Sequence, residues 1–311
     1  MQKEDLLRCH EKIRPFIHRT PVMTSHLLNE LAGAELFFKC ENLQRMGAFK
    51  MRGGVHAALN LSPDQQQRGV VTHSSGNFAQ ALALAAKTLG IRAYIVMPSN
   101  APAVKKRAVE AYGGLITECA PTLQAREAAA AKIQQEKGAA FLHPYDDHEV
   151  ILGQGTAALE LLEDQPNLDY LLAPVGGGGL ISGTALAAHF FGKNCQTIGA
   201  EPFAVDDAYR SLQSGKIESN ASTDTIADGL KTNLGEKTFP LIQQHVRKII
   251  RVEESEIVAA MRLIWERMKL VTEPSGAVPF AALLREKANF YQKKVGVILS
   301  GGNVDLSNLP F

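Results

Sequence analysis

The 311-residue chain has no apolar run of about 18 residues or more, so nothing in it predicts a membrane-spanning helix. Neither sign of charge is in excess: 33 Lys and Arg against 32 Asp and Glu leave a net charge of +1. This balance gives no electrostatic reason to bind nucleic acid or a membrane surface. The N-terminus is too charged for a secretory signal. We therefore expect a cytoplasmic protein with neither of these partners.

Cysteine motifs, repeats and low-complexity linkers are also missing. The four cysteines, Cys9, Cys40, Cys119 and Cys195, are scattered without Cys-x-x-Cys spacing, which favours reduced, structural thiols. Hydrophobic residues make up 45% of the chain and charged residues 21%, as in a globular protein of one or two domains with an ample core.

What the chain does have is alternation of short aliphatic runs with longer Ala/Leu-rich stretches, which is typical of parallel βαβ units. We predict strands over 36–40, 69–73, 93–97, 170–175, 197–200 and 295–300. We predict helices over 79–89, 103–111, 124–137, 153–162, 180–191 and 254–268. The pattern indicates an open α/β fold whose sheets are covered on both faces.

Three glycine-rich or hydroxyl-rich segments follow predicted strands: 74–77, 176–179 and 300–303. Ligands of open α/β sheets bind beyond the carboxyl ends of the strands, so these segments can converge on one ligand. Lys50 lies in another glycine-containing segment, and a lysine amine can form a Schiff base with a carbonyl cofactor. Glycine N–H groups opening a helix can hold a phosphate. Together they suggest pyridoxal phosphate (PLP).

Each motif taken alone has a simpler interpretation. The glycine run is as well explained by a tight turn, and Lys50 by a solvated surface lysine. Ser75 alone would most often cap a helix. Glu201, Asp206 and Asp207 alone would most often be loop carboxylates in water. Their joint occurrence favours the cofactor site. A dinucleotide site fails, because no Gly-x-Gly-x-x-Gly with its downstream acidic residue follows that strand.

The order and spacing of these motifs resemble those of the fold-type II PLP enzymes of the serine racemase and serine/threonine dehydratase family. The resemblance covers nearly the whole chain, through segments 19–21, 37–41, 47–50, 71–77, 153–156, 226–229, 265–269 and 300–306. It implies a tryptophan synthase β-like fold with two open twisted α/β domains and the active site in the cleft between them. We expect a large PLP-binding domain of residues 1–68 and 147–311, and a small mobile domain of residues 69–146.

Residue by residue, the resemblance implies that Lys50 forms the Schiff base with PLP and that Asn77 contacts the 3-hydroxyl of the ring. Ser300 would bond the pyridine nitrogen, and the phosphate would be wrapped by Gly176, Gly177, Gly178 and Gly179. A hydroxyl does not hold the ring nitrogen protonated as a carboxylate would, which tempers the electron sink.

The resemblance also places Ser75 across the cofactor from Lys50, as the second acid/base that racemisation needs. Many threonine dehydratases carry alanine at this position. The substrate carboxylate would be held by Ser74, Ser75, Gly76 and Asn77, with Arg126 as a further anchor. The alternative interpretation of Arg126 is a solvated arginine on a surface helix.

Segment 201–207 of this chain is similar to the divalent-cation site of serine racemases. Carboxylates of Glu201 and Asp207 and the carbonyl of Val205 would offer oxygen ligands for structural Mg²⁺ or Ca²⁺. Gln80, Lys269 and Asn303 match positions associated with ATP in animal racemases, whereas Arg45 and Met46 replace the lysine and threonine expected there. ATP is thus a possible activator.

Two departures from the family pattern bear on the substrate. Phe78 stands where the family usually has histidine, and Tyr145 stands where animal racemases have asparagine and dehydratases often have an aromatic residue. The chain stops five residues after Leu306, without room for the regulatory domain of biosynthetic threonine dehydratases, so we do not expect feedback by isoleucine.

We therefore expect a serine racemase that also eliminates serine to pyruvate and ammonia, and that is a homodimer acting on a small amino acid. The alternative is a threonine/serine ammonia-lyase or a 3-hydroxyaspartate dehydratase without significant racemisation. A non-catalytic PLP-binding sensor is a third possibility, which the presence of both Lys50 and Ser75 disfavours.

Overall fold

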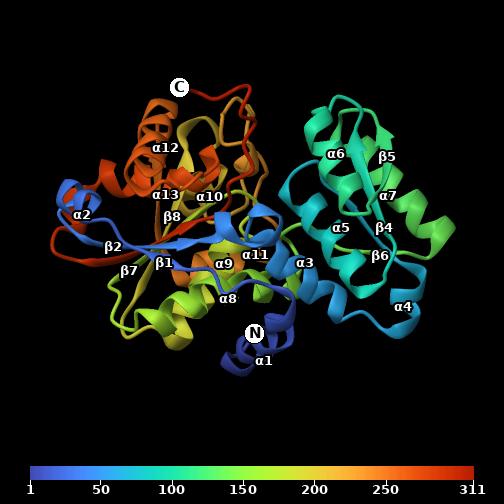
Figure 1. The fold of residues 1–311 in the computed structure, drawn as a ribbon, viewed down its shortest axis with the longest axis horizontal. Coiled ribbons are helices and arrows are strands. Elements are labelled where there is room, and N and C mark those ends of the chain that lie inside the picture. Colours follow the sequence, from blue (N-terminus) through green and yellow to red (C-terminus); the bar gives the residue numbers. More distant parts are fainter.

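The computed structural model describes residues 1–311 and contains two open sheets (Figure 1). The larger has six strands in the order β1-β2-β10-β7-β8-β9, and the smaller has four in the order β5-β4-β3-β6. All neighbouring strands are parallel except β1 and β2. The strands are β1 Val22–Met23, β2 Glu35–Cys40, β3 Val70–His73, β4 Ala93–Pro98, β5 Leu115–Cys119, β6 Ala140–Phe141, β7 Tyr170–Pro174, β8 Gln196–Pro202, β9 Val246–Val252 and β10 Lys294–Leu299.

Helices connect the parallel strands, as crossover connections require. They are α1 Lys3–Ile13, α2 His26–Ala32, α3 Lys50–Leu59, α4 Pro63–Arg68, α5 Asn77–Leu89, α6 Ala103–Ala111, α7 Leu123–Lys137, α8 His148–Asp164, α9 Gly179–Phe191, α10 Asp207–Ser214, α11 Thr238–His245, α12 Glu254–Met268 and α13 Pro274–Arg285. None of these helices is both long enough and apolar enough to cross a membrane.

Both faces of the larger sheet are covered (Figure 1). One core is formed with α1, α8, α9 and α11, and it includes Leu6, Leu159 and Ile181. The other is formed with α2, α12 and α13, and it includes Leu28, Ile264 and Phe280. Because the central strands bury apolar side chains on both faces of the sheet, their sequences are continuous aliphatic runs and do not alternate between apolar and polar residues.

The smaller sheet lies in the second lobe of Figure 1 and is also covered on both faces. Helices α5 and α6 pack on one face through residues such as Leu82 and Val109. Helix α7 packs on the other through Ala130 and Ile133. The connection between the lobes includes α3, which contacts α8 on one side and α5 on the other.

The six predicted strands and six predicted helices are all present, with shifts of a few residues at their ends. Strand β9 was not predicted, because Arg247, Lys248 and Arg251 interrupt its aliphatic residues. Helix α3 was not predicted, because it contains Gly53 and Gly54, which have low helix propensity. Gly53 packs so closely that an added Cβ would lie 2.7 Å from the Val150 carbonyl oxygen.

Candidate active site

Lys50 is the first residue of α3 and lies between the two lobes. Its Nζ donates a 2.8 Å hydrogen bond to the carbonyl oxygen of Pro144. The amine also lies 5.1 Å from the ring centre of Phe49 and 5.8 Å from that of Phe78. Withdrawal from water lowers the pKa of Lys50 to about 8, although the Glu273 carboxylate acts in the opposite direction. A larger fraction of this amine is therefore uncharged near neutral pH than for a lysine in water.

The segment that follows β10 lies directly against the segment that precedes Lys50. The Phe49 N–H donates to the Ser300 carbonyl oxygen at 3.0 Å, and Ala48 forms a β-bridge with Gly301. Ser300 itself is buried. Two segments about 250 positions apart in the sequence thus meet, and they bring the Ser300 hydroxyl to the region of Lys50.

Asn77, the first residue of α5, connects the two lobes through a side-chain network. Its amide nitrogen donates to both carboxylate oxygens of Glu273, at 2.9 and 3.2 Å. Its amide oxygen accepts a 2.8 Å bond from Asn303, which also bonds the Met46 carbonyl oxygen. Sequence reasoning missed Glu273, because a single glutamate before a helical proline carries no motif. Burial first and then the Asp228 charge raise the pKa of Glu273 to about 7, with Asn77 opposing.

This raised pKa makes the stability of the cofactor-free protein depend on pH. An acid whose pKa is higher in the folded than in the unfolded chain stabilises the fold when protonated, and this contribution is lost as pH rises from about 4.5 to about 7. The difference in free energy of unfolding between Glu273→Gln and the parent should therefore shift in favour of the variant by up to about 3 kcal/mol between pH 4 and pH 8. Denaturant unfolding at both pH values measures the shift. An equal difference at both would contradict the assignment.

Ser74, Ser75 and Gly76 form the turn between β3 and α5. Gly76 is the N-cap of α5, and no side chain caps this helix, so Ser75 does not have the capping role that is the simpler interpretation of a lone serine. The Ser75 hydroxyl makes no hydrogen bond, and the first N–H groups of the helix are free to bind an anion. Arg126 on α7 is half-buried, and its charge contributes after burial to lowering the pKa of His73, which ends β3.

The glycine run lies between β7 and α9, and its shape leaves no room for side chains. Gly178 has φ +91° and is the N-cap of α9, again without a capping side chain. An added Cβ would lie 2.3 Å from the Tyr145 ring at Gly177 and 3.0 Å from the Gly229 carbonyl oxygen at Gly176. Uncapped N–H groups at a helix N-terminus, lined only by glycine, fit the phosphate of PLP.

Tyr145 connects this glycine loop with Lys50. Its ring packs against Gly177, and its Cβ and backbone lie against Gly179. The residue before it, Pro144, accepts the Lys50 hydrogen bond. The His143 ring stands edge-on to the Tyr145 ring at 4.6 Å. Burial lowers the pKa of His143 to about 4, so this imidazole is neutral at physiological pH.

The predicted cation ligands Glu201, Val205 and Asp207 lie together but away from Lys50, after the end of β8. Both carboxylates are buried, and burial first, then the neighbouring Asp207 charge, raise the pKa of Glu201 well above its ordinary value. Backbone N–H groups of Ala208 and Tyr209 donate to Glu201. No third His, Cys, Asp or Glu side chain joins them in a metal-binding cluster. Hard oxygen donors in this number fit a cation that keeps part of its water shell.

The three predicted nucleotide residues are not brought together by hydrogen bonds. Asn303 belongs to the Asn77 network, and Gln80 is buried one turn further along α5. Lys269 is exposed, and its amine donates to the Glu266 carbonyl oxygen of its own helix.

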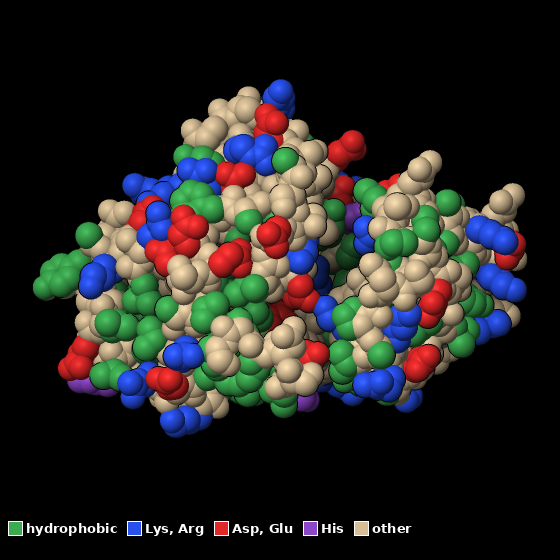
Figure 2. Space-filling view, turned by 90° about the horizontal axis from the view of Figure 1, so that it is seen from above, with side chains coloured by type: hydrophobic (Ala, Val, Ile, Leu, Met, Phe, Trp, Pro, Cys, Tyr) green, Lys and Arg blue, Asp and Glu red, His purple; other side chains and the backbone are tan.

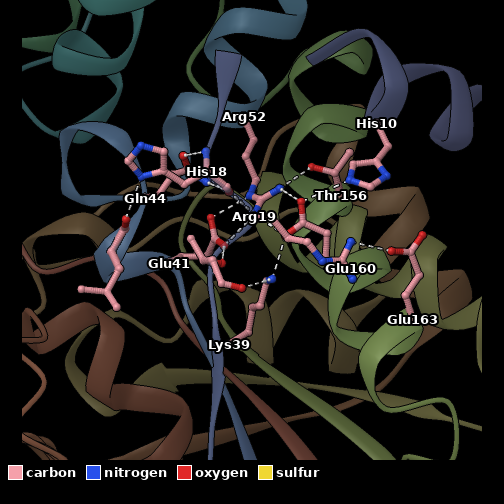
Figure 3. A network of polar contacts seen from close by, with 12 residues as sticks. His10, His18, Arg19, Lys39, Glu41, Gln44, Arg52, Thr156, Glu160 and Glu163 are labelled. Carbon is pink, nitrogen blue, oxygen red and sulfur yellow. Dashed lines mark hydrogen bonds and ion pairs between the residues drawn. The ribbon is translucent and has the colours of Figure 1, made fainter. Parts of the chain in front are cut away.

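A buried ion network anchors the helix that carries Lys50 (Figure 3). Arg52 donates two hydrogen bonds to Glu41, of 2.7 and 2.8 Å, and two to Glu160, of 2.9 and 2.8 Å. Lys39 donates to Glu160 at 2.7 Å. All four side chains are at most 1% exposed, so two positive charges balance two negative ones away from water. The network ties α3 to the end of β2 and to α8.

Between the lobes the surface is hollowed, with basic and acidic side chains on both rims (Figure 2). Two open, mostly parallel sheets with a lysine-bearing helix at their junction and a glycine loop at the end of β7 define a PLP-dependent enzyme of fold type II. The chain belongs to the pyridoxal-phosphate dependent enzyme family, whose model matches residues 13–301.

Known proteins resemble the chain along its whole length. It is 50% identical over 308 residues to the β-hydroxyaspartate dehydratase of Paracoccus denitrificans, covering 99% of this chain and 98% of that protein. It is 48% identical over 310 residues to the serine racemase of Dictyostelium discoideum, covering 98% and 96%. The structure of maize serine racemase superposes with a TM-score of 0.96 at 45% identity, covering 98% of this chain and 94% of that one.

Proposed function

We propose that this enzyme interconverts L- and D-serine and also eliminates serine to pyruvate and ammonia. The observation that carries the proposal is the free Ser75 hydroxyl, in a turn with uncapped N–H groups, in the cleft that also holds the Lys50 amine. The serine racemases among its relatives support it. Dehydration of 3-hydroxyaspartate, threonine or serine without racemisation is the second candidate, favoured by the 50% identical β-hydroxyaspartate dehydratase.

The glycine loop would hold the cofactor phosphate, Asn77 would contact the 3-hydroxyl, and Ser300 would bond the ring nitrogen. When bound, PLP supplies an electron sink that makes the Cα–H bond of an amino acid acidic. Lys50 is the base for that proton. A pKa of about 8 gives it an uncharged fraction near neutral pH while it remains basic enough to remove the proton.

The substrate carboxylate would bind the free N–H groups and hydroxyls of Ser74, Ser75, Gly76 and Asn77. Arg126, near the end of β3, would add a positive charge. Ser75 then donates its hydroxyl proton to Cα from the face opposite Lys50, which inverts the configuration. If the β-hydroxyl leaves first as water, addition of water to the product completes the conversion of serine to pyruvate and ammonia.

Residues 69–146, which contain the smaller sheet, would move as a unit toward the larger one. Asn77 of one lobe bonds Glu273 and Asn303 of the other, so these residues would be where the lobes meet. Closure would bring Ser75 and Arg126 to the cofactor and exclude water.

Glu201, Asp207 and the Val205 carbonyl would hold structural Mg²⁺ or Ca²⁺, because two buried carboxylates without a paired lysine or arginine favour a bound cation. Adding Mg²⁺ to chelator-treated protein should raise its melting temperature. An unchanged value would exclude the site.

A cytoplasmic homodimer that ATP activates completes the proposal. The four cysteines are free, as in a reducing compartment. Sedimentation of a monomer would contradict the dimer. A Mg·ATP titration that changes neither turnover nor melting would contradict activation.

Ser75→Ala tests the role of the second face. The variant should lose racemisation of L-serine by about 10²-fold or more, because the proton donor for the opposite face is removed, while dehydration falls far less. D-serine and pyruvate are measured in the same samples. Ser99→Ala, at an exposed loop serine, is the control and should change neither rate. Equal loss of both reactions in Ser75→Ala would contradict the two-face assignment.

A further inference from the structure

One ion pair closes the cleft from lobe to lobe. Lys105 on α6 bonds the carboxylate of Asp228, which begins a short 3₁₀ turn, Asp228–Leu230, in the other lobe. The adjacent Lys106 behaves differently. It donates to the Ser99 carbonyl oxygen at 2.8 Å and to Glu118 at 2.6 Å, both within its own lobe. Of two neighbouring lysines, only Lys105 bonds a side chain of the other lobe.

Asp228, the partner of Lys105, lies at the edge of the glycine loop, residues 176–179. Gly229, the residue after Asp228, places its carbonyl oxygen 3.0 Å from where a Cβ of Gly176 would be. Its N–H donates to Ser275, in the first turn of α13, at 3.0 Å. Glu273, which Asn77 contacts, lies close enough for the charges of both Asp228 and Lys105 to act on its pKa. The ion pair is therefore beside the space between Asn77 and the glycine loop.

We propose that Lys105 determines acceptance of a second substrate carboxylate, so that the site takes β-hydroxy dicarboxylic amino acids such as 3-hydroxyaspartate besides serine. This inference rests on the proposed function, which already names 3-hydroxyaspartate as a candidate substrate, and deepens it by assigning Lys105 to the distal carboxylate. Asp228 is the only side-chain partner of the Lys105 ammonium, which has three donors. Lys105 is 29% exposed and Asp228 45% exposed, so neither side chain of this pair is closed off from solvent.

Exchange of one carboxylate for another explains how the same site serves both substrates. A distal substrate carboxylate replaces Asp228 as the partner of Lys105, and Asp228 turns to water, so the number of paired charges is unchanged. Serine has no second carboxylate and leaves the Lys105–Asp228 pair intact. An uncharged residue in place of Lys105 would leave the distal carboxylate facing Asp228 alone, and like charges repel.

The chemistry is the same elimination with one more carboxylate. Lys50 removes the Cα proton, the β-hydroxide leaves as water, and water adds back when the nitrogen is released. 3-Hydroxyaspartate thus gives one four-carbon 2-oxo dicarboxylate and one ammonia, with no oxidant or reductant. The β-hydroxyaspartate dehydratase at 50% identity agrees with such a substrate.

The test compares Lys105→Met with Lys106→Met in the PLP-loaded enzyme. We measure kcat/KM for L-serine and for 3-hydroxyaspartate. In Lys105→Met, the ratio of the 3-hydroxyaspartate value to the serine value should fall at least about tenfold, mainly through KM, as expected for one lost charge pair. In Lys106→Met the ratio should not change. An unchanged ratio in Lys105→Met would overturn the assignment. If the ratio then falls in Arg126→Met, Arg126 binds the second carboxylate instead.

Binding of succinate, with butyrate as the monocarboxylate control, separates this inference from the proposed function. By calorimetry, succinate should bind at least about tenfold more weakly to Lys105→Met than to the parent, and butyrate equally to both. If the parent turns over neither amino acid, the proposed function fails, while succinate binding still tests Lys105. If the parent turns over 3-hydroxyaspartate and succinate binds both proteins equally, only the inference fails.

Discussion

Lys50→Ala should lower kcat/KM for L-serine by at least about 10³-fold, because it removes both the covalent attachment point of the cofactor and the base for the Cα proton. The purified variant should also lack the visible absorbance of PLP bound as a Schiff base. Stopped assays of pyruvate and D-serine, together with an absorption spectrum, measure the two effects.

The control is Lys132→Ala, which removes an exposed lysine of α7 and should leave both readouts unchanged. Retention of turnover in Lys50→Ala within tenfold of the parent would mean that another amine serves the reaction. The 2.8 Å contact between Lys50 and the Pro144 carbonyl oxygen would then be a structural hydrogen bond and no more.

Arg52→Met should lower the free energy of unfolding by about 3–5 kcal/mol, because it leaves the carboxylates of Glu41 and Glu160 buried with Lys39 as their only full positive charge. Removing one partner of a buried ion pair costs far more than the intact pair contributes. Denaturant unfolding with guanidine measures the loss, and PLP binding should weaken with it since α3 carries Lys50.

The matched control is Arg19→Met, which breaks the exposed pairs that Arg19, itself 48% exposed, forms with Glu163 and Asp164, which are 42% and 36% exposed. Such a pair contributes about 1 kcal/mol or less. Adding Glu41→Gln to Arg52→Met should recover part of the loss, because it removes the unpaired charge. Equal destabilisation by Arg52→Met and Arg19→Met would contradict the importance of burial.

The fold was readable from the sequence where strands are buried on both faces. Strands such as β7 and β10 are short, mainly aliphatic runs, and their length and the glycines that follow them identify them. Strand β5 is partly exposed and carries Glu118, and β6 has only two residues, so neither has a local signal. Helix α3 depends on tertiary packing of Gly53 and Gly54 against α8 and α5, which no local propensity expresses.

The candidate site was predictable in its motifs and unpredictable in its connections. Lys50, Asn77 and the glycine loop each lie in a recognisable segment. Glu273 and Pro144 have no such segment, and they enter the site through contacts that span 196 and 94 positions. The Lys105–Asp228 pair spans 123 positions and is likewise visible only in the folded chain.

The most direct measurement is the fate of L-serine with the PLP-loaded enzyme and Mg²⁺, with D-serine followed by chiral chromatography and pyruvate assayed in the same samples. Our account predicts D-serine and pyruvate together. Pyruvate without D-serine would contradict the assignment of Ser75 as the proton donor of the second face, and would make the enzyme a dehydratase.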